Sequence, residues 1–312
     1  MKMTTKKIFD IVSMGEPMVE FNQTGEKQGR VFLQGFGGDT SNFSVSAARQ
    51  GAKVAYLTSV GDDPYGEMLK QMWRSDGIDV QGVFTNPEAF TAIYFVTHNE
   101  NGHQFDFFRK GSAASLMKPS QLWFDLICQS KVFHYSGISI AISEEARQTC
   151  WSAVEFARGN GVRVTFDTNL RLKLWPIETA RTEIKKAISL CDLCLPSWGD
   201  MFAISGISDP HEIISYCHEL GAPVVALKLG EKGALISDGS EMWEINPLPC
   251  KAVDATGAGD TFGGALVYRW CEGDNWGIAG KYAATAAALS TEGYGAVEPI
   301  PYFHTVFNRA KD

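Results

Sequence analysis

The segment DATGAGDTF, residues 254–262, places three small residues between two carboxylates. Gly257, Ala258 and Gly259 stand between Asp254 and Asp260, and the apolar, helix-like stretch TFGGALVYRW follows. Small residues entering a helix leave backbone N–H groups pointing outward, at the positive end of the helix dipole. Such a turn suits a phosphoryl group, because glycines let it approach the backbone closely. Asp260 is placed to accept the proton of an incoming hydroxyl.

Two other kinds of glycine-rich site do not fit this segment. A dinucleotide fingerprint needs G-x-G-x-x-G after the first strand, with an acidic residue about 20 residues further on. Here the glycines follow the spacing G-x-G-x-x-x-G near the C-terminus, so a dehydrogenase is disfavoured. The chain also contains no G-x-x-x-x-G-K-[ST] phosphate loop. On these residues alone, a plain turn in which Asp260 only caps the helix stays an alternative.

The composition bounds the class of protein. The chain has 312 residues, 45% hydrophobic and 21% charged, as is ordinary for a globular protein. Its net charge of −8 argues against a general nucleic-acid binder, but not against anionic small substrates. Asp10 interrupts the first apolar stretch, so we expect a cytoplasmic protein without signal peptide or membrane span. Seven cysteines fit reduced thiols, and Cys191-x-x-Cys194 is interpreted as two half-buried strand residues.

Strand and helix patterns alternate along most of the chain. This alternation is typical of a mostly parallel sheet covered by helices on both faces. The predicted fold is therefore α/β, a three-layer α/β/α sandwich in a single domain over residues 1–312. The expected strands are 8–15, 53–61, 131–137, 162–169, 192–197 and 223–230, and the expected helices are 40–51, 63–77, 143–161, 176–190, 257–271 and 275–291.

Two stretches interrupt this alternation. Residues 17–36 and 80–110 carry short strands with no helices between them, so they cannot join a parallel sheet through helical crossovers. We expect them to form a small separate β-sheet that lies over a cleft as a lid. Exposed apolar lid strands such as TAIYFVTH are a liability, which makes a homodimer through the lid strands a hypothesis.

The opening segment, extended to DATGAGDTFGGAL, resembles the C-terminal signature of the PfkB, or ribokinase-like, carbohydrate kinases. Residues 35–66, GFGGDTSNFSVSAARQGAKVAYLTSVGDDPYG, resemble the N-terminal signature of that family. The two segments occur in the expected order, and the resemblance spans nearly the whole chain. It implies a ribokinase-like fold, ATP and Mg²⁺ as cofactors, and Asp260 as catalytic base. The amides of Gly257, Ala258 and Gly259 would form the anion hole.

Four more segments resemble the 2-keto-3-deoxygluconate kinases of this family, namely GEPMVEF, FFRKGSAAS, YSGISIAIS and DTNLRLKLWP. This resemblance implies that the terminal hydroxyl of 2-dehydro-3-deoxy-D-gluconate is phosphorylated. Arg109 and Arg171 are each expected at a strand end with few paired acids nearby, where they can bind the substrate carboxylate through charge-assisted hydrogen bonds. An exposed strand-end charge is the alternative for each arginine.

The resemblance also assigns residues to the sugar site, position by position. The lid contributes two aromatic side chains, and relatives often have Tyr at one of these positions where this chain has Phe. Asp39 is interpreted either as a site residue or as the cap of the helix that follows. The residues assigned to the sugar are Gly37, Gly38, Asn42, Tyr94, Phe107, Arg109, Ile138, Arg171 and Asp260.

On the nucleotide side, residues 227–236, LKLGEKGALI, resemble the family segment K-x-G-x-x-G, although a simple hairpin also fits. Ser197 and Asp200 stand where the family commonly has an N-x-x-E motif, so Mg²⁺ is expected to depend on the phosphates rather than on protein ligands. Ala284 replaces an Asn that many relatives place near the adenine. The residues assigned to ATP are Ser197, Lys228, Gly230, Gly233, Gly257 and Gly259.

We therefore expect a kinase of a small-molecule sugar acid with no nucleic-acid or membrane partner. One alternative is a neutral-sugar kinase of the fructokinase or ribokinase type. Another is a catalytically silent relative that binds sugar or nucleotide. Asp254 is expected either to cap the turn or to help hold a monovalent cation.

Overall fold

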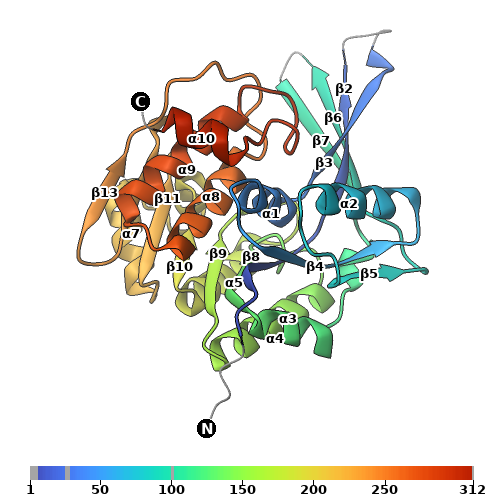
Figure 1. Cartoon of the computed structure of the whole chain (residues 1–312), viewed down its shortest axis with the longest axis horizontal. Helices are drawn as coiled ribbons and strands as arrows, with labels where there is room; N and C mark the ends of the chain where they lie inside the picture. The colour runs from blue at the N-terminus through green and yellow to red at the C-terminus, as the bar shows by residue number, and fades with distance from the viewer. Residues whose placement is uncertain (1–5, 25–28, 100–101, 311–312) are drawn as a thin grey trace.

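The computed structural model describes residues 6–24, 29–99 and 102–310, and Figure 1 shows a large α/β body with a small sheet projecting from it. The predicted domain 1–312 includes residues 1–5 and 311–312, and the two lid stretches include residues 25–28 and 100–101. These residues lie outside the described ranges. Within the described ranges, no helix is both long enough and apolar enough to cross a membrane.

A nine-stranded sheet forms the centre of the body, in the order β13-β12-β11-β10-β9-β8-β1-β4-β5. Neighbouring strands from β11 to β5 pair in parallel, whereas β12 and β13 are antiparallel at one edge. The predicted mostly parallel sheet is therefore confirmed. The strands are β1 Phe9–Met14, β4 Val54–Gly61, β5 Val83–Asn86, β8 Ser130–Ser136, β9 Arg163–Asp167, β10 Leu193–Leu195, β11 Val224–Lys228, β12 Ala234–Ser237 and β13 Met242–Ile245.

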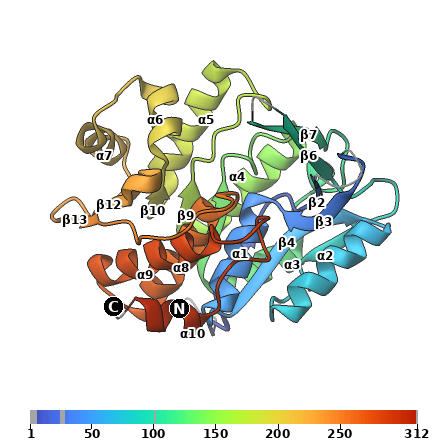
Figure 2. The ribbon, with the colours of Figure 1, turned by 90° about the horizontal axis from the view of Figure 1, so that it is seen from above.

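Helices cover both faces of this sheet, as Figure 2 shows from above. One apolar core lies between the sheet and α1, α2, α8, α9 and α10, and a second lies between the sheet and α3 to α7. The predicted three-layer sandwich is confirmed. The helices are α1 Asp39–Arg49, α2 Pro64–Ser75, α3 Gln121–Cys128, α4 Glu144–Gly159, α5 Ile177–Leu190, α6 Trp198–Ser205, α7 Pro210–Glu219, α8 Ala258–Glu272, α9 Trp276–Ser290 and α10 Phe303–Arg309.

Local sequence sets the helix boundaries. Asp63 caps α2 by accepting a hydrogen bond from the Gly66 amide at 2.8 Å, and Pro64 occupies the first helical position. Helix α8 starts after Gly257 and ends before Gly273, and both glycines adopt the left-handed conformation. The helices predicted over 63–77 and 257–271 are confirmed to within a few residues.

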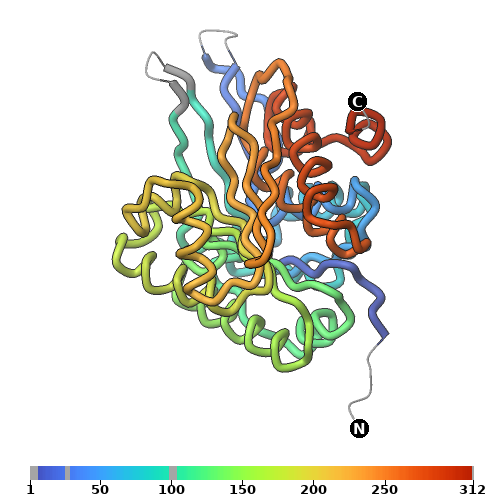
Figure 3. The backbone as a smooth tube through the Cα atoms, turned by 90° about the vertical axis from the view of Figure 1, so that its left-hand side faces the viewer, coloured from blue at the N-terminus to red at the C-terminus, as the bar shows by residue number. Residues whose placement is uncertain are grey.

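The second sheet contains four strands in the order β3-β2-β6-β7 and projects from the body in Figures 1 and 3. Its outer pairs are antiparallel and β2 pairs with β6 in parallel. The predicted separate small sheet is confirmed, whereas its position over a cleft as a lid and its role in a homodimer stay predictions. The strands are β2 Met18–Gln23, β3 Phe32–Gly37, β6 Ile93–Asn99 and β7 Gly102–Phe108.

Two local predictions are wrong. The lid does not include β5, which pairs in parallel with β4 at the edge of the large sheet and thereby buries Val83 in the main core. Cys191 and Cys194 are both fully buried rather than half-buried, and Cys191 follows the last turn of α5 instead of lying in a strand. In both cases the observed position buries apolar side chains in the core, namely Val83 of β5 and the two cysteines.

The chain order of the large sheet reverses between β1 and β8. Strands β4 and β5 lie beyond β1, and β9 to β11 lie beyond β8. Ligands of open α/β sheets bind outside the carboxyl ends of the strands at such a switch point. Gly15, Asp167, Ser197 and Lys228 all stand at or just after carboxyl ends of these parallel strands.

Candidate active site

Asp260 lies in the first turn of α8 and contacts α1. Its Oδ2 accepts a hydrogen bond of 2.9 Å from Asn42 Nδ2. The two helices approach closely because Gly264 has no side chain, and a Cβ there would lie 2.4 Å from the backbone oxygen of Phe43. Close packing of the helices thus brings together two residues that the sequence analysis assigned to one site.

Several acidic groups surround Asp260. Burial raises the pKa of its carboxyl to about 8, and the negative charges of Asp39 and Asp167 act in the same direction. The hydrogen bond from Asn42 and the positive charge of Lys228 oppose this rise. A carboxyl whose pKa lies near the working pH is suited to accept a proton from a hydroxyl.

The turn before α8 presents free backbone amides. Gly257 has a φ of 76°, and a Cβ there would lie 2.9 Å from the backbone oxygen of Ala296, so the position requires glycine. The amides of Gly257 and Gly259 have no hydrogen-bond partner among the described residues, whereas Ala258 donates to the Ala255 carbonyl at 3.2 Å. Of the three amides predicted to hold an anion, two are therefore free.

Asp254 holds this turn in place. Its Oδ1 accepts hydrogen bonds from the Thr256 amide at 2.9 Å and the Thr256 hydroxyl at 2.6 Å, and its Oδ2 accepts one from the Gly295 amide at 3.0 Å. The interpretation of Asp254 as a turn cap is confirmed, and its role toward a monovalent cation stays a prediction.

Lys228, the last residue of β11, places a cation beside the turn. Its Nζ binds Asp167 Oδ2 at 2.5 Å and would lie 3.5 Å from a Cβ on Gly259. Burial lowers the pKa of Lys228, but the charge and hydrogen bond of Asp167 together with the charges of Asp260 and Asp200 outweigh it, so the pKa is raised and the ammonium is retained. The free amides and this ammonium together make a positive site beside Asp260.

The other residues assigned to the nucleotide form local turns. Gly230 and Gly233 connect β11 and β12 as an antiparallel hairpin, so the hairpin interpretation is confirmed. The Ser197 hydroxyl caps α6 by accepting the Asp200 amide at 3.2 Å. Asp200 Oδ2 in turn accepts from the Thr168 hydroxyl at 2.8 Å, close to the end of β9. Contact of these residues with ATP stays a prediction.

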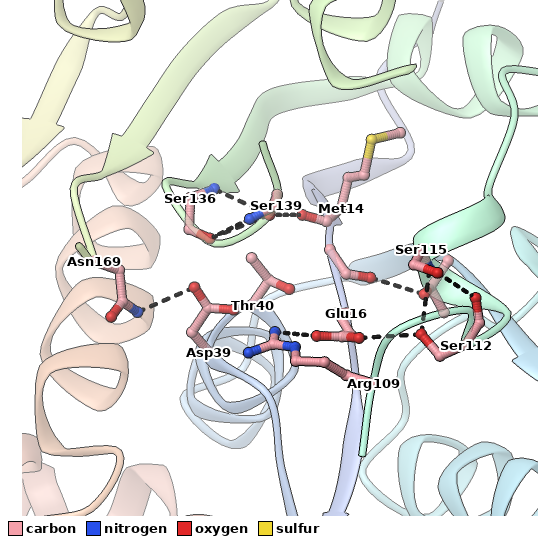
Figure 4. Close-up of polar contacts among 12 residues, drawn as sticks. Met14, Glu16, Asp39, Thr40, Arg109, Ser112, Ser115, Ser136, Ser139 and Asn169 are labelled. Atoms are coloured by element: carbon pink, nitrogen blue, oxygen red, sulfur yellow. Dashed lines mark hydrogen bonds and ion pairs between the residues drawn. The ribbon is translucent and has the colours of Figure 1, made fainter. Parts of the chain in front are cut away.

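Arg109 follows β7 and forms an ion pair with Glu16, which follows β1 (Figure 4). The other oxygen of Glu16 accepts a hydrogen bond from the Ser112 hydroxyl at 3.2 Å. Burial raises the pKa of Glu16, against the opposing charge of Arg109. The prediction that Arg109 has few acids nearby is wrong, because the end of β1 places a buried carboxylate against it. Arg109 Nε is buried and has no hydrogen-bond partner among the described residues.

Arg171 is placed differently from Arg109. It lies four positions after the last residue of β9, is exposed, and donates to the neighbouring Leu170 carbonyl at 2.8 Å. The alternative of an exposed charge therefore describes Arg171 in this structure. Ile138 lies in a turn, where its carbonyl accepts hydrogen bonds from the amides of Ala141 and Ile142, and its contact with the sugar stays a prediction.

Glu20 of β2 and Tyr94 of β6 are neighbours within the small sheet. Tyr94 is buried, donates a short hydrogen bond to Glu20, and faces Phe107 across the β6–β7 pair. A Cβ on Gly37 would lie 2.5 Å from the Tyr94 hydroxyl, so the glycine makes room for this tyrosine. Burial raises the pKa of Glu20, against the hydrogen bond from Tyr94. Phe107 is partly exposed beside Arg109.

Gly38 and Asp39 begin α1 without a side-chain cap. Gly38 has a φ of 99°, and a Cβ there would lie 2.3 Å from the backbone oxygen of Glu16. Asp39 is the first helical residue, and its Oδ2 accepts a hydrogen bond of 3.0 Å from Asn169 Nδ2 (Figure 4). The interpretation of Asp39 as a helix cap is therefore wrong, because Gly38 occupies the cap position and no side chain caps α1.

Comparison with known proteins identifies the family. The model of the pfkB family of carbohydrate kinases matches residues 9–302. The chain belongs to the pfkB family of carbohydrate kinases. It is 34% identical to fructokinase-2 of Solanum lycopersicum over 83% of this chain and 81% of that protein. It is 31% identical to 2-dehydro-3-deoxygluconokinase of Thermoproteus tenax over 96% of this chain and 94% of that protein.

Solved structures agree with this assignment. An E. coli protein assigned as ribokinase II, in complex with ATP and Mg²⁺, aligns with a TM-score of 0.89 and 25% identity over 97% of this chain and 99% of that one. The fold of the pfkB kinase is thus ribokinase-like, as predicted.

The donor set bears on how Mg²⁺ is held. In the ranges that the structure describes, no three His, Cys, Asp or Glu side chains are grouped so as to hold a metal ion. The free amides and Lys228 instead fit the phosphates of a nucleotide, and Mg²⁺ is commonly held through phosphates and water. These residues fit a pfkB kinase that binds the ion together with ATP.

Sequence reasoning missed four residues of this site. Glu16 and Glu20 lie in the segment GEPMVEF, and Asp167 and Asn169 lie in the segment DTNLRLKLWP, both of which resemble the 2-keto-3-deoxygluconate kinases. Glu16, Asp167 and Asn169 stand at or just after strand ends, which is a signal in the sequence, whereas Glu20 lies within β2 and has no such signal. Their partners, which come from distant parts of the chain, could not be inferred from spacing.

Proposed function

We propose that this pfkB kinase transfers the γ-phosphoryl group of ATP to the primary hydroxyl of 2-dehydro-3-deoxy-D-gluconate, giving the 6-phosphate. The observation that carries the proposal is the half-buried carboxylate of Asp260, which Asn42 holds beside a turn with free amides and the ammonium of Lys228. Phosphoryl transfer to an alcohol requires a base for the hydroxyl proton next to a site that binds the negatively charged phosphoryl group.

Asp260 acts as the base in this scheme. Its Oδ2 is held by Asn42, so Oδ1 takes the proton of the sugar hydroxyl. The hydroxyl oxygen forms a bond to the γ-phosphorus as the bond from phosphorus to the ADP oxygen breaks. Mg²⁺ bound with ATP supplies positive charge to the phosphates.

The turn and Lys228 stabilise the transferred group. The amides of Gly257 and Gly259 donate hydrogen bonds to phosphoryl oxygens, in a site where the dipole of the 15-residue helix α8 also favours negative charge. Lys228 adds a full positive charge beside Gly259, and Asp167 keeps its ammonium in place.

Two features support a sugar acid as the substrate. Arg109 retains an unpartnered, buried Nε that can donate to a carboxylate, although Glu16 occupies another nitrogen of its guanidinium. A relative named as a 2-dehydro-3-deoxygluconokinase aligns over nearly the whole chain. Arg171 is exposed, so it reaches the substrate only if its side chain turns from Leu170.

A neutral sugar such as fructose is the second candidate. The ion pair between Glu16 and Arg109 favours it, because the carboxylate of Glu16 already compensates the arginine that would bind a substrate carboxylate. A fructokinase at 34% identity points the same way.

ATP turnover against a panel of sugars and keto-deoxy acids tests the proposal. We expect 2-dehydro-3-deoxygluconate to give the highest kcat/KM, and Arg109→Ala to lower it more than it lowers any residual turnover of fructose. A higher kcat/KM for fructose would overturn the sugar-acid assignment in favour of the second candidate. If none of the sugars or acids in the panel supports ATP turnover, the protein is a silent binding protein.

A further inference from the structure

Asp39 is a buried carboxylate with one oxygen unused. Only 8% of the residue is exposed, and Oδ2 accepts the hydrogen bond from Asn169. Oδ1 is fully buried and has no hydrogen-bond partner among the described residues. A buried acceptor of this kind is costly unless a ligand completes its hydrogen bonding.

The position of Asp39 places this free oxygen inside the sugar site. The preceding residue, Gly38, packs against the backbone of Glu16, the partner of Arg109. The negative charge of Asp39 also raises the pKa of both Glu16 and Asp260. Figure 4 shows its side chain between Asn169 and the Glu16–Arg109 pair. Asp39 is therefore near both the proposed base and the ion pair of the arginine that is proposed to face the other end of the substrate.

Asn169 is held in an unusual conformation to make this contact. It has a φ of 30°, and among the described residues it is the sole non-glycine residue with a positive φ. The backbone N–H of Asn169 also donates a hydrogen bond of 3.2 Å to Oδ1 of Asp167, the last residue of β9. Backbone strain of this kind persists where surrounding contacts fix it, and it is often found at ligand sites.

We propose that Asp39 is a specificity-determining residue whose Oδ1 accepts a hydrogen bond from an interior hydroxyl of the sugar, while Asn169 holds its other oxygen. The proposal rests on the proposed sugar-kinase function and deepens it. The hydroxyl belongs to a carbon between the phosphorylated end and the end that faces Arg109. In 2-dehydro-3-deoxygluconate these hydroxyls are on C4 and C5.

The nearby unpartnered atoms match such a substrate. Within the part of the chain that the structure describes, Asn42 Oδ1 is a second buried acceptor without a partner, and Arg109 Nε is a buried donor without one. Two acceptors and one donor suit a polyhydroxylated chain with an acceptor group at its far end. A sugar with its interior hydroxyl removed would leave Asp39 unpaired and buried.

The test compares wild type and Asp39→Ala on a parent sugar and its monodeoxy analogues. For 2-dehydro-3-deoxygluconate these are the 4-deoxy and 5-deoxy compounds. If fructose is the better substrate, the 3-deoxy and 4-deoxy fructoses are used, so failure of the sugar-acid assignment is recognised separately. We expect Asp39→Ala to lower kcat/KM for the parent roughly 10- to 150-fold, the range for a hydrogen bond to a charged group.

The decisive comparison is the coupling between the two changes. With the wild-type enzyme, the kcat/KM of one analogue should be lower than that of the parent by a factor similar to the loss caused by Asp39→Ala. For this analogue, Asp39→Ala should lower kcat/KM by no more than about a further twofold. Equal losses on the parent and on every analogue would overturn the proposal, because Asp39 would then act only on the fold or on Asp260. An unchanged kcat/KM for the parent would also overturn it.

Two further variants guard against a misfolded protein. Asp125→Asn removes an exposed carboxylate from α3 and should leave every substrate unaffected. Asn169→Ala releases Asp39 Oδ2, and we expect a smaller loss than with Asp39→Ala, seen mainly in KM. ATP affinity by calorimetry should match wild type in all three variants.

Discussion

Asn42 and Asp260 are 218 residues apart in the chain, yet Asn42 Nδ2 donates a 2.9 Å hydrogen bond to Asp260 Oδ2. The contact joins the two segments that carry the family signatures, through helices packed at Gly264. It fixes the rotation of the carboxylate and leaves Oδ1 to face a substrate. Asn42 is thus a positioning residue for the proposed base.

Replacing Asn42 tests this role. Asn42→Ala frees the carboxylate to rotate, and we expect kcat to fall by about 100-fold, as for a misplaced catalytic group. The lost hydrogen bond favoured the ionised form of Asp260, so its pKa should rise and the acid limb of the pH profile should move to higher pH. An unmoved acid limb would contradict a direct contact in the working enzyme.

The pH dependence of the wild-type enzyme follows from the same group. Asp260 is protonated below its pKa of about 8 and cannot then accept a proton. We expect kcat/KM to rise between pH 6 and pH 9 with an apparent pKa near 8, because the pH dependence of kcat/KM reports the pKa of the base in the free enzyme. Steady-state rates at saturating ATP measure this. A flat profile over that interval would show that another group is titrating or that no base is required.

Stability should change in the opposite sense to activity. The pKa of Asp260 is raised from 3.8 to about 8, so ionisation opposes folding increasingly as pH rises between these values. Asp260→Asn removes this penalty and should raise the melting temperature at pH 8. At pH 4, where both folded side chains are neutral, the two proteins should melt alike. Calorimetry at both pH values checks the sign, and a lower melting temperature of the variant at pH 8 would contradict it.

The pair of Lys228 and Asp167 offers a separate test. Lys228→Met leaves the buried Asp167 without its cation, and loss of one partner of a buried ion pair costs about 3–5 kcal/mol of unfolding free energy. The double variant with Asp167→Leu should recover much of that stability but not the ATP affinity. Urea unfolding and calorimetric titration separate the two effects. Recovery of ATP affinity in the double variant would remove Lys228 from the anion site.

Much of this molecule follows from local patterns. The strand and helix periods predict the parallel sheet, and the turn residues 257–259 with Asp260 predict a base beside free amides. The strand β5 was predicted in the wrong sheet, because its place depends on whether β4 or the lid offers the better partner. Glu16 was missed for a related reason, since only the fold brings the end of β1 to Arg109.

The central claim is that Asp260 is the base, and turnover of Asp260→Asn with ATP and the preferred sugar tests it most directly. The amide keeps the shape of the side chain but cannot take a proton. We expect turnover to fall at least roughly 100-fold, the lower end for loss of a general base, while calorimetry finds ATP and sugar affinities near those of wild type. Full turnover of the variant would contradict the account.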